Sequence, residues 1–134
     1  MREILFRGKS VDCVTDGEWV YGYYNVHRGG FDDEYHEYIQ EKCGINHMVD
    51  PDTVGQFTGL LDKNGNKIFE GDILHGLYGD MLVCFGEIIG YGMGFMWKPV
   101  IEGGKWESIT GFVDEYEVIG NKWDNPELLE GGVE

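Results

Sequence analysis

The stretch DKNGNKIFEGD, residues 62–72, contains the residue types of a calcium-binding loop. A twelve-residue EF-hand loop takes oxygen ligands at its first, third and fifth positions, glycine at its sixth and a bidentate glutamate at its twelfth. The three oxygen positions are filled by Asp62, Asn64 and Asn66. The sixth position is Lys67 and the twelfth is Ile73, and no helical pattern flanks the stretch. The sequence therefore predicts no metal site here.

The same stretch fits a hairpin turn. Two apolar runs flank the pair Asn64-Gly65, and Asn-Gly is preferred in type I′ turns because both residues must take positive φ. Asp62 and Asn66 are then residues at the edges of the turn.

A second group, His36, Cys43 and His47, lies within twelve residues and contains zinc-ligand types. Its spacing matches no familiar zinc pattern, and a fourth ligand would have to come from elsewhere. Two surface histidines and a half-buried thiol are the preferred interpretation. We therefore predict neither a metal nor a cofactor.

The residues capable of nucleophilic catalysis give no recognisable pattern. Cys84 lies in the apolar stretch LVCFG, whereas a reactive thiol needs an electropositive, accessible niche. The two serines, Ser10 and Ser108, are outside any nucleophile-elbow pattern. The glycines of GYGMGF, residues 90–95, lack the following helix of a phosphate site and predict a hairpin bend. We predict no catalytic residue and a protein that is not an enzyme.

The composition limits the partners and the compartment. The 134 residues include 25 acidic and 10 basic side chains, a net charge of −15, and residues 68–134 hold 13 acidic and 3 basic ones. Because phosphate binding needs clustered Lys and Arg, direct nucleic-acid or membrane binding is not expected. No apolar run is long enough for a membrane span or a signal peptide. The three cysteines include no CxxC pair, which favours reduced thiols in the cytoplasm.

Residues 18–26, EWVYGYYNV, give the strongest strand pattern. One face would carry Trp19, Tyr21 and Tyr23, and the other Val20, Tyr24 and Val26. Both faces are bulky, so we expect this strand to be covered on both sides. Gly22 in its middle indicates a bulge or a close backbone approach.

The remaining elements are short. YHEYIQE, residues 35–41, favours a strand over a helical turn, although residues 27–47 stay open between strand and helix. Short helical turns are expected after Asp50 and Asn125, each followed by proline. Gly-punctuated strands are expected from Ile73 to Trp97, followed by strand-like pieces in WESITGF and YEVIGNKW. With 22 glycines and 3 prolines, the chain is predicted to be a single mainly β domain, a barrel or a sandwich.

Aromatic strand faces give the best signal for a contact surface. Aromatic residues on strands more often form cores, but Tyr and Trp are also enriched at protein interfaces. The candidate contact residues are Trp19, Tyr21, Tyr23, Phe95 and Trp97.

Four segments in order, REILFRGKS, GEWVYGYY, VDPDTVGQFTGLLDKNGNKIFEGDIL and YEVIGNKWDNPELL, resemble the YopX family of phage and prophage proteins. The resemblance covers well over half of the chain. It implies an all-β protein built around a small SH3-like barrel, without an established activity. One such arrangement over residues 1–134 packs an N-terminal β extension, residues 1–50, on a barrel formed by residues 51–134.

The positions characteristic of that family are mostly turn formers, which the resemblance implies to be determinants of the fold. Together with the turn residue Asn64, they are Gly55, Gly59, Gly65, Gly71, Asp72, Gly120, Asn125 and Pro126.

Three functions follow in order of preference. The first is a non-enzymatic binding or assembly module in a bacterial host cell, whose partner is a homo-oligomer mate or a host or phage protein. The second is an acidic decoy that imitates DNA and inhibits a host nucleic-acid-binding protein. The third is an enzyme acting on a nucleotide or small metabolite, which would need a pocket around His75, Cys84 and Asp72.

Overall fold

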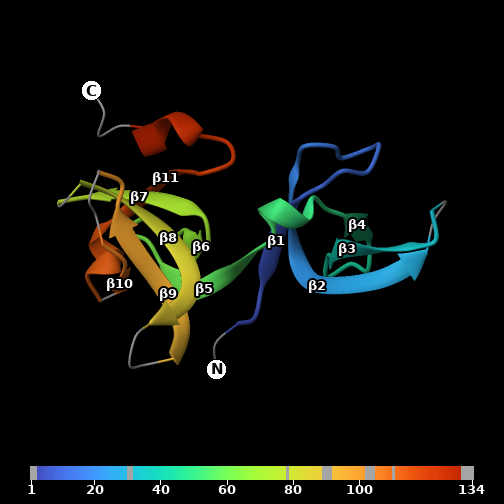
Figure 1. The fold of residues 1–134 in the computed structure, drawn as a ribbon, viewed down its shortest axis with the longest axis horizontal. Coiled ribbons are helices and arrows are strands. Elements are labelled where there is room, and N and C mark those ends of the chain that lie inside the picture. Colours follow the sequence, from blue (N-terminus) through green and yellow to red (C-terminus); the bar gives the residue numbers. More distant parts are fainter. Residues whose placement is uncertain are drawn as a thin grey trace. The chain divides into compact units, whose positions relative to one another are not determined.

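The computed structural model describes residues 3–29, 32–77, 79–88, 92–101, 105–109 and 111–130. Antiparallel strands dominate it, and three short 3-10 helices accompany them, so the predicted mainly β class with short helical turns is confirmed. The chain divides into two compact units, Met1–Phe57 and Thr58–Glu134 (Figure 1). Strand β5, Gly55–Leu61, begins in the first unit and ends in the second. The predicted single domain with residues 1–50 packed on a barrel stays a prediction.

The first unit is a sheet with the order β4-β3-β2-β1, in which β1 also pairs with the first residues of β5. These strands are β1 (Phe6–Lys9), β2 (Trp19–Gly29), β3 (Glu34–Gln40) and β4 (Asn46–Met48). The strand predicted for YHEYIQE is therefore confirmed as β3. Its small core contains Val20, Ile39 and Val49, with Phe6 and Val54 packed against them.

Gly22 confirms the predicted close approach of backbone. A Cβ atom at this position would lie 2.0 Å from the carbonyl oxygen of Gln40. Only hydrogen fits there, so β2 and β3 can come together at this point because residue 22 has no side chain.

The prediction that β2 is covered on both faces is wrong. Val20 is buried, but Tyr23 is 56% exposed on one face and Val26 is 48% exposed on the other. The small core is formed by Val20, Ile39 and Val49, and β2 continues past both this core and the end of β1 opposite Gly22. Alternation of side chains assigns residues to the two faces of a strand, but it does not say what lies over either face.

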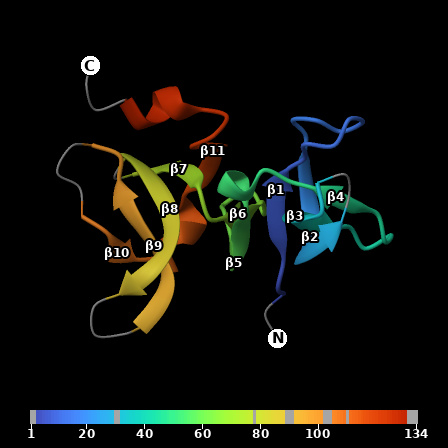
Figure 2. The ribbon, with the colours of Figure 1, turned by 45° about the vertical axis from the view of Figure 1, so that its right-hand side comes forward.

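The second unit has a sheet with the order β10-β9-β8-β7-β11, and β6 pairs with β5 (Figure 2). The strands are β6 (Lys67–Phe69), β7 (Asp72–Gly76), β8 (Gly79–Ile88), β9 (Gly92–Pro99), β10 (Glu107–Ser108) and β11 (Glu117–Asn121). Its core consists of Ile68, Leu74, Met81, Val83, Trp97, Val113 and Tyr116. No sheet closes on itself within the described ranges, so the SH3-like barrel stays a prediction.

The helical turns follow the proline signals. Helix η1 (Pro51–Thr53) begins after Asp50, whose carboxylate accepts a bond from the Asp52 amide. Helix η3 (Pro126–Glu130) begins with the predicted tail proline. The strand-like piece expected in WESITGF is confirmed for Glu107–Ser108, which form β10, and η2 (Gly111–Glu115) begins within the same segment. Two residues of the bend predicted at 90–95 lie outside the described ranges, and β9 begins at Gly92.

The segment 62–66 is the turn between β5 and β6, as predicted, but its type differs. Gly65 has the positive φ that a type I′ turn needs, at +82°. Asn64 does not, because Asp33 is the one non-glycine residue with positive φ in the described part of the chain. The type I′ prediction is therefore wrong. The Gly65 amide donates to the Asp62 carbonyl, as in a type I turn ending in glycine.

The Asp62 carboxylate explains this geometry. It accepts bonds from the amides of Asn64, Asn66 and Val118. Burial alone would raise the pKa of Asp62, but these amide bonds hold it below its ordinary value. The oxygens that resemble calcium ligands therefore fix the turn and attach it to β11.

No helix in the described ranges is both long enough and apolar enough to cross a membrane.

Candidate functional site

Beyond Gly22, β2 and β3 continue as an arm formed by residues 23–29 and 34–40, which β4 joins along residues 38–40 (Figure 1). The arm exposes large side chains on both faces. Tyr23 is exposed on the face that it shares with Trp19, and Tyr24, Val26 and Tyr35 are exposed on the opposite face. Tyr35 is the most exposed of them, at 69%. Exposed Tyr clusters of this kind are typical of contact surfaces, because Tyr combines a large apolar ring with a polar end.

The first three predicted contact residues lie on one face of β2, but their surroundings differ. Trp19 is half-buried, with the guanidinium of Arg7 at 4.6 Å from its ring centroid and the ammonium of Lys9 at 5.6 Å. Tyr21 is about half-exposed, and Tyr23 is more exposed still. Exposure therefore increases from Trp19 toward the arm.

The other two predicted contact residues, Phe95 and Trp97, lie on β9 of the second unit and differ from each other. Trp97 is only 5% exposed and packs against Tyr116, so it is a core residue and the prediction needs correction there. Phe95 is half-buried and contacts Phe85 edge to face, with ring centroids 5.0 Å apart. Both belong to one face of β9, which is covered at Trp97 and more open toward Phe95.

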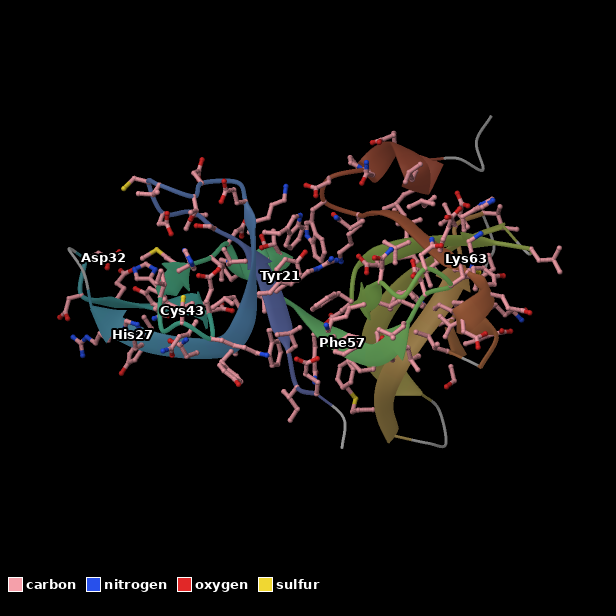
Figure 3. All side chains as sticks on the ribbon, turned by 180° about the vertical axis from the view of Figure 1, so that it is seen from behind. Tyr21, His27, Asp32, Cys43, Phe57 and Lys63 are labelled. Carbon is pink, nitrogen blue, oxygen red and sulfur yellow. The ribbon has the colours of Figure 1, made fainter. Side chains whose placement is uncertain are left out.

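Polar side chains line the Tyr23 face of the arm. Asn25 and Asn46 exchange amide bonds, and Asn46 also donates to Nε2 of His27, which stacks on Tyr38 at a centroid distance of 4.1 Å. Figure 3 shows His27 on β2 between Tyr21 and the end of the arm near Asp32. These bonds hold the face in one conformation, so it can present fixed groups to a partner.

The end of the arm is held by ion pairs. Arg28 donates to the Asp33 carboxylate at 2.7 Å, and His36 lies 2.9 Å from Asp32. Asp33 takes positive φ, at 54°, in the connection between the strands. Both pairs lie mostly in solvent, so each contributes little to stability.

A buried cluster around His47 had no signal in the sequence. Nδ1 of His47 lies 2.9 Å from Asp12, and Nε2 lies 3.4 Å from Glu41, within ion-pair distance but without a hydrogen bond in the described part of the chain. Asp12 also accepts a bond from the hydroxyl of Thr15. Asp12 is far along the chain from Glu41 and His47, and the three belong to no motif, so the fold brings them together.

The chemistry of this cluster is that of a cation between two carboxylates. A neutral imidazole has one N–H donor, whereas imidazolium has two and can satisfy both acidic neighbours. The bond from His47, followed by those from Thr15, holds the pKa of Asp12 well below its ordinary value. The bond to Asp12 raises the pKa of His47 despite the opposing effect of burial. Both ring nitrogens face acids, so His47 is poorly placed to act as a general base.

We expect the stability of the first unit to depend on this cluster and on pH. A raised His47 pKa stabilises the fold below pH 6.5, and this contribution is lost as pH rises through the folded-state pKa. A lowered Asp12 pKa stabilises above pH 3.8, and this contribution is lost as pH falls through its folded-state value. Replacing His47→Gln should cost about 1.5–3 kcal/mol at pH 5.5 and less at pH 9. Urea denaturation at the two pH values measures both, and an equal loss at each would contradict the ion-pair assignment.

The His36, Cys43 and His47 group is dispersed. His36 pairs with Asp32 at the end of the arm, His47 belongs to the buried cluster, and Cys43 is exposed with its Sγ 3.6 Å from Glu41. No group of three or more His, Cys, Asp or Glu side chains within the described ranges is arranged to hold a metal ion.

His75, Cys84 and Asp72 also have separate surroundings. Asp72 is buried and accepts a bond from the Phe69 amide, while His75, three residues along β7, points to the other face and binds Asp80 at 2.7 Å. Cys84 is on β8, where burial, and then the charge of Glu70, raise the pKa of its thiol. These residues are not arranged as one catalytic group.

Most of the predicted turn positions gather at one end of the β7–β11 pair. Asp72 pairs with Asn121, the Lys122 amide donates to the Gly71 carbonyl, and Asn125 accepts from the Asn121 amide. Gly120 lies against Asn125, and Pro126 begins η3 directly after it. The other four positions lie elsewhere: Gly55 pairs with Arg7 on β1, Gly59 takes a positive φ of 86° in β5, and Asn64 and Gly65 lie in the turn between β5 and β6.

Comparison with known proteins gives one family match and one described structural neighbour. The model of the family described as YopX protein matches residues 6–130. Among solved structures, the crystal structure of protein EF1440 from Enterococcus faecalis is 23% identical, with a TM-score of 0.44, covering 97% of this chain and all of that one. No curated protein matches.

Proposed function

The chain belongs to the YopX family, and from this premise we propose that it is a non-enzymatic binding or assembly module that acts through protein–protein contacts. The observation that carries the proposal is the arm of β2 and β3. It exposes Tyr23, Tyr24, Val26 and Tyr35 on strands that continue past the end of β1.

The candidate chemical groups support a non-enzymatic function. Both ring nitrogens of His47 face carboxylates, and the thiol of Cys84 is made less reactive by burial. Asp72 and Asp62 use their carboxylates to bind backbone amides. Each of these groups serves the fold, and none is combined with a base, a nucleophile and an oxyanion donor in the way that catalysis requires.

The finer parts of the proposal extend the family assignment. We place the protein in the cytoplasm of a bacterial host, encoded by a phage or prophage, with a homo-oligomer mate or a host or phage protein as partner. An SH3-like barrel in the second unit belongs to the same proposal. The acidic-decoy alternative rests on the net charge of −15 and ranks second.

The test removes the aromatic groups of the arm. We expect the double variant Tyr23→Ser with Tyr35→Ser to lose contacts made by the full chain, because both rings are exposed and contribute little to the core. Light scattering after size exclusion measures the mass, and retention of host proteins on immobilised protein measures other partners. The matched control is Trp106→Ser, which changes an exposed aromatic residue outside the arm.

Two results would reject the proposal. One is a strictly monomeric protein that retains the same host proteins before and after the arm is changed. The other is a measured turnover of a nucleotide or small metabolite that is lost in His47→Gln or Cys84→Ser.

A further inference from the structure

We propose that the open edge of β2 in the arm pairs, antiparallel and about a two-fold axis at Val26, with the same edge of a second copy of this chain. The inference rests on the proposed binding function and names the partner. It follows from which way the backbone groups point, from where the charges lie, and from the order of the side chains along the strand.

The backbone groups of β2 alternate between two sides. On β3, the carbonyl of Glu37 accepts from the Val49 amide and the Glu41 amide donates to Ile45, so odd-numbered residues of β3 direct their groups toward β4. In an antiparallel strand, every second residue directs its amide and carbonyl to the same neighbouring strand. The even-numbered residues of β3 therefore bind β2. Tyr38 lies opposite Asn25, which makes the odd-numbered residues of β2 the partners of β3.

Tyr24, Val26 and Arg28 therefore direct their amides and carbonyls away from β3. Strand β1 ends opposite Gly22 on that side. Within the described ranges, no backbone bond reaches these three residues from there. Three N–H and three C=O groups thus form an open edge, and only another strand satisfies such a row of alternating donors and acceptors.

The charges favour a second β2 as that strand. The whole strand Trp19–Gly29 contains no acidic residue, although the chain has 25 of them, and its one full charge is Arg28. The carboxylates of the arm's two strands, Glu34 and Glu37, lie on β3, which would be the outer strand on each side of the pair. The carboxylates at the end of the arm, Asp32 and Asp33, are paired with His36 and Arg28. Two acidic chains can therefore approach along β2 without placing carboxylates against each other.

The side chains are complementary in this register. With Val26 opposite its own copy, Tyr24 lies opposite Arg28 of the partner, and Asn25 lies opposite the partner's His27. The first pairing places a guanidinium beside a phenol ring, which is a favourable contact. The second places an amide beside an imidazole. Beyond β4 the arm has only two strands, and the pairing would make this part a four-stranded sheet, which is more stable in water than a two-stranded ribbon.

A charge exchange at residue 26 tests the pairing in the full chain. Val26 is 48% exposed, so a charged side chain is tolerated in the free protein. We expect the wild type to reach twice the chain mass of 15.2 kDa in light scattering. Val26→Glu and Val26→Lys should each weaken the dimer by about tenfold or more, because like charges then face each other across the axis. An equimolar mixture of the two should restore a dimer.

Controls separate this pairing from a general effect on the arm. Gln40→Lys changes an exposed side chain on β3, away from the open edge, and should leave the mass unchanged. Circular dichroism checks that each variant folds. Val26→Lys should disturb folding less than Val26→Glu, because residue 26 lies opposite Glu37, which attracts a lysine and repels a glutamate.

Two outcomes overturn the inference. In the first, the wild type is monomeric; if arm variants still lose a host partner, the proposed function stands and only the self-pairing fails. In the second, both charge variants stay dimeric alone, which places the dimer contact elsewhere.

Discussion

Replacing Gly71→Ala should lower the free energy of unfolding by about 2–5 kcal/mol. Two costs combine at this position. Gly71 has a φ of +92°, where a side chain strains the backbone, and a Cβ would lie 2.2 Å from the ring of Trp123. Moving the indole would disturb the hydrogen-bonded segment in which Lys122 donates to the Gly71 carbonyl. Chemical denaturation followed by tryptophan fluorescence measures the loss.

Gly65 provides the matched control. Its φ of +82° is close to that of Gly71, but a Cβ there meets no atom within 4 Å. Gly65→Ala should therefore carry only the backbone cost, about 1–2 kcal/mol. Equal losses for the two alanine variants would contradict the contact with Trp123 as a cause.

Replacing Gly22→Ala should cost about 3 kcal/mol and loosen the arm. A Cβ here would lie 2.0 Å from the Gln40 oxygen and 2.7 Å from its carbonyl carbon. Both are backbone atoms, so β2 and β3 would have to separate. The backbone hydrogen bonds between the two strands near Gly22 would then lengthen. Thermal denaturation by circular dichroism gives the loss, and faster amide exchange along Trp19–Gly29 locates it.

Gly86 provides the control, because it is also a strand glycine but its nearest neighbour is a flexible side chain that can move. Its added Cβ would meet the terminal methyl carbon of Met96 at 2.8 Å. Because that side chain is flexible, Gly86→Ala should cost about 1 kcal/mol or less. A Gly22→Ala variant as stable as Gly86→Ala would refute the close approach of β2 and β3.

The turns of this fold were predictable from sequence because their causes are local. Asn64-Gly65 placed a hairpin correctly, and Asp50 with Pro51 and Asn125 with Pro126 placed two helical turns. The type of the hairpin turn was not predictable, because it depends on the bonds of the Asp62 carboxylate, one of which comes from Val118 more than 50 residues away.

The residues that cover a strand face were also not predictable, because they come from parts of the chain that are distant in sequence. Tyr21 and Trp97 have similar patterns of alternating neighbours, yet Tyr21 is half-exposed and Trp97 is buried. The difference arises from which strands pair and where they end, as β1 does opposite Gly22. The His47 cluster is a stronger case, since Asp12 and Glu41 come from two separate connections, His47 comes from β4, and they share no spacing rule.

Amide hydrogen exchange at increasing protein concentration tests the central claim, that the arm is a contact surface. The amides of Tyr24, Val26 and Arg28 point outward from the described sheet, so they should exchange fast in dilute solution. We expect their exchange to slow as concentration rises, while Tyr35 on the outer strand changes little. Exchange at residues 23–29 that is independent of concentration, with protection appearing at another surface instead, would contradict the account.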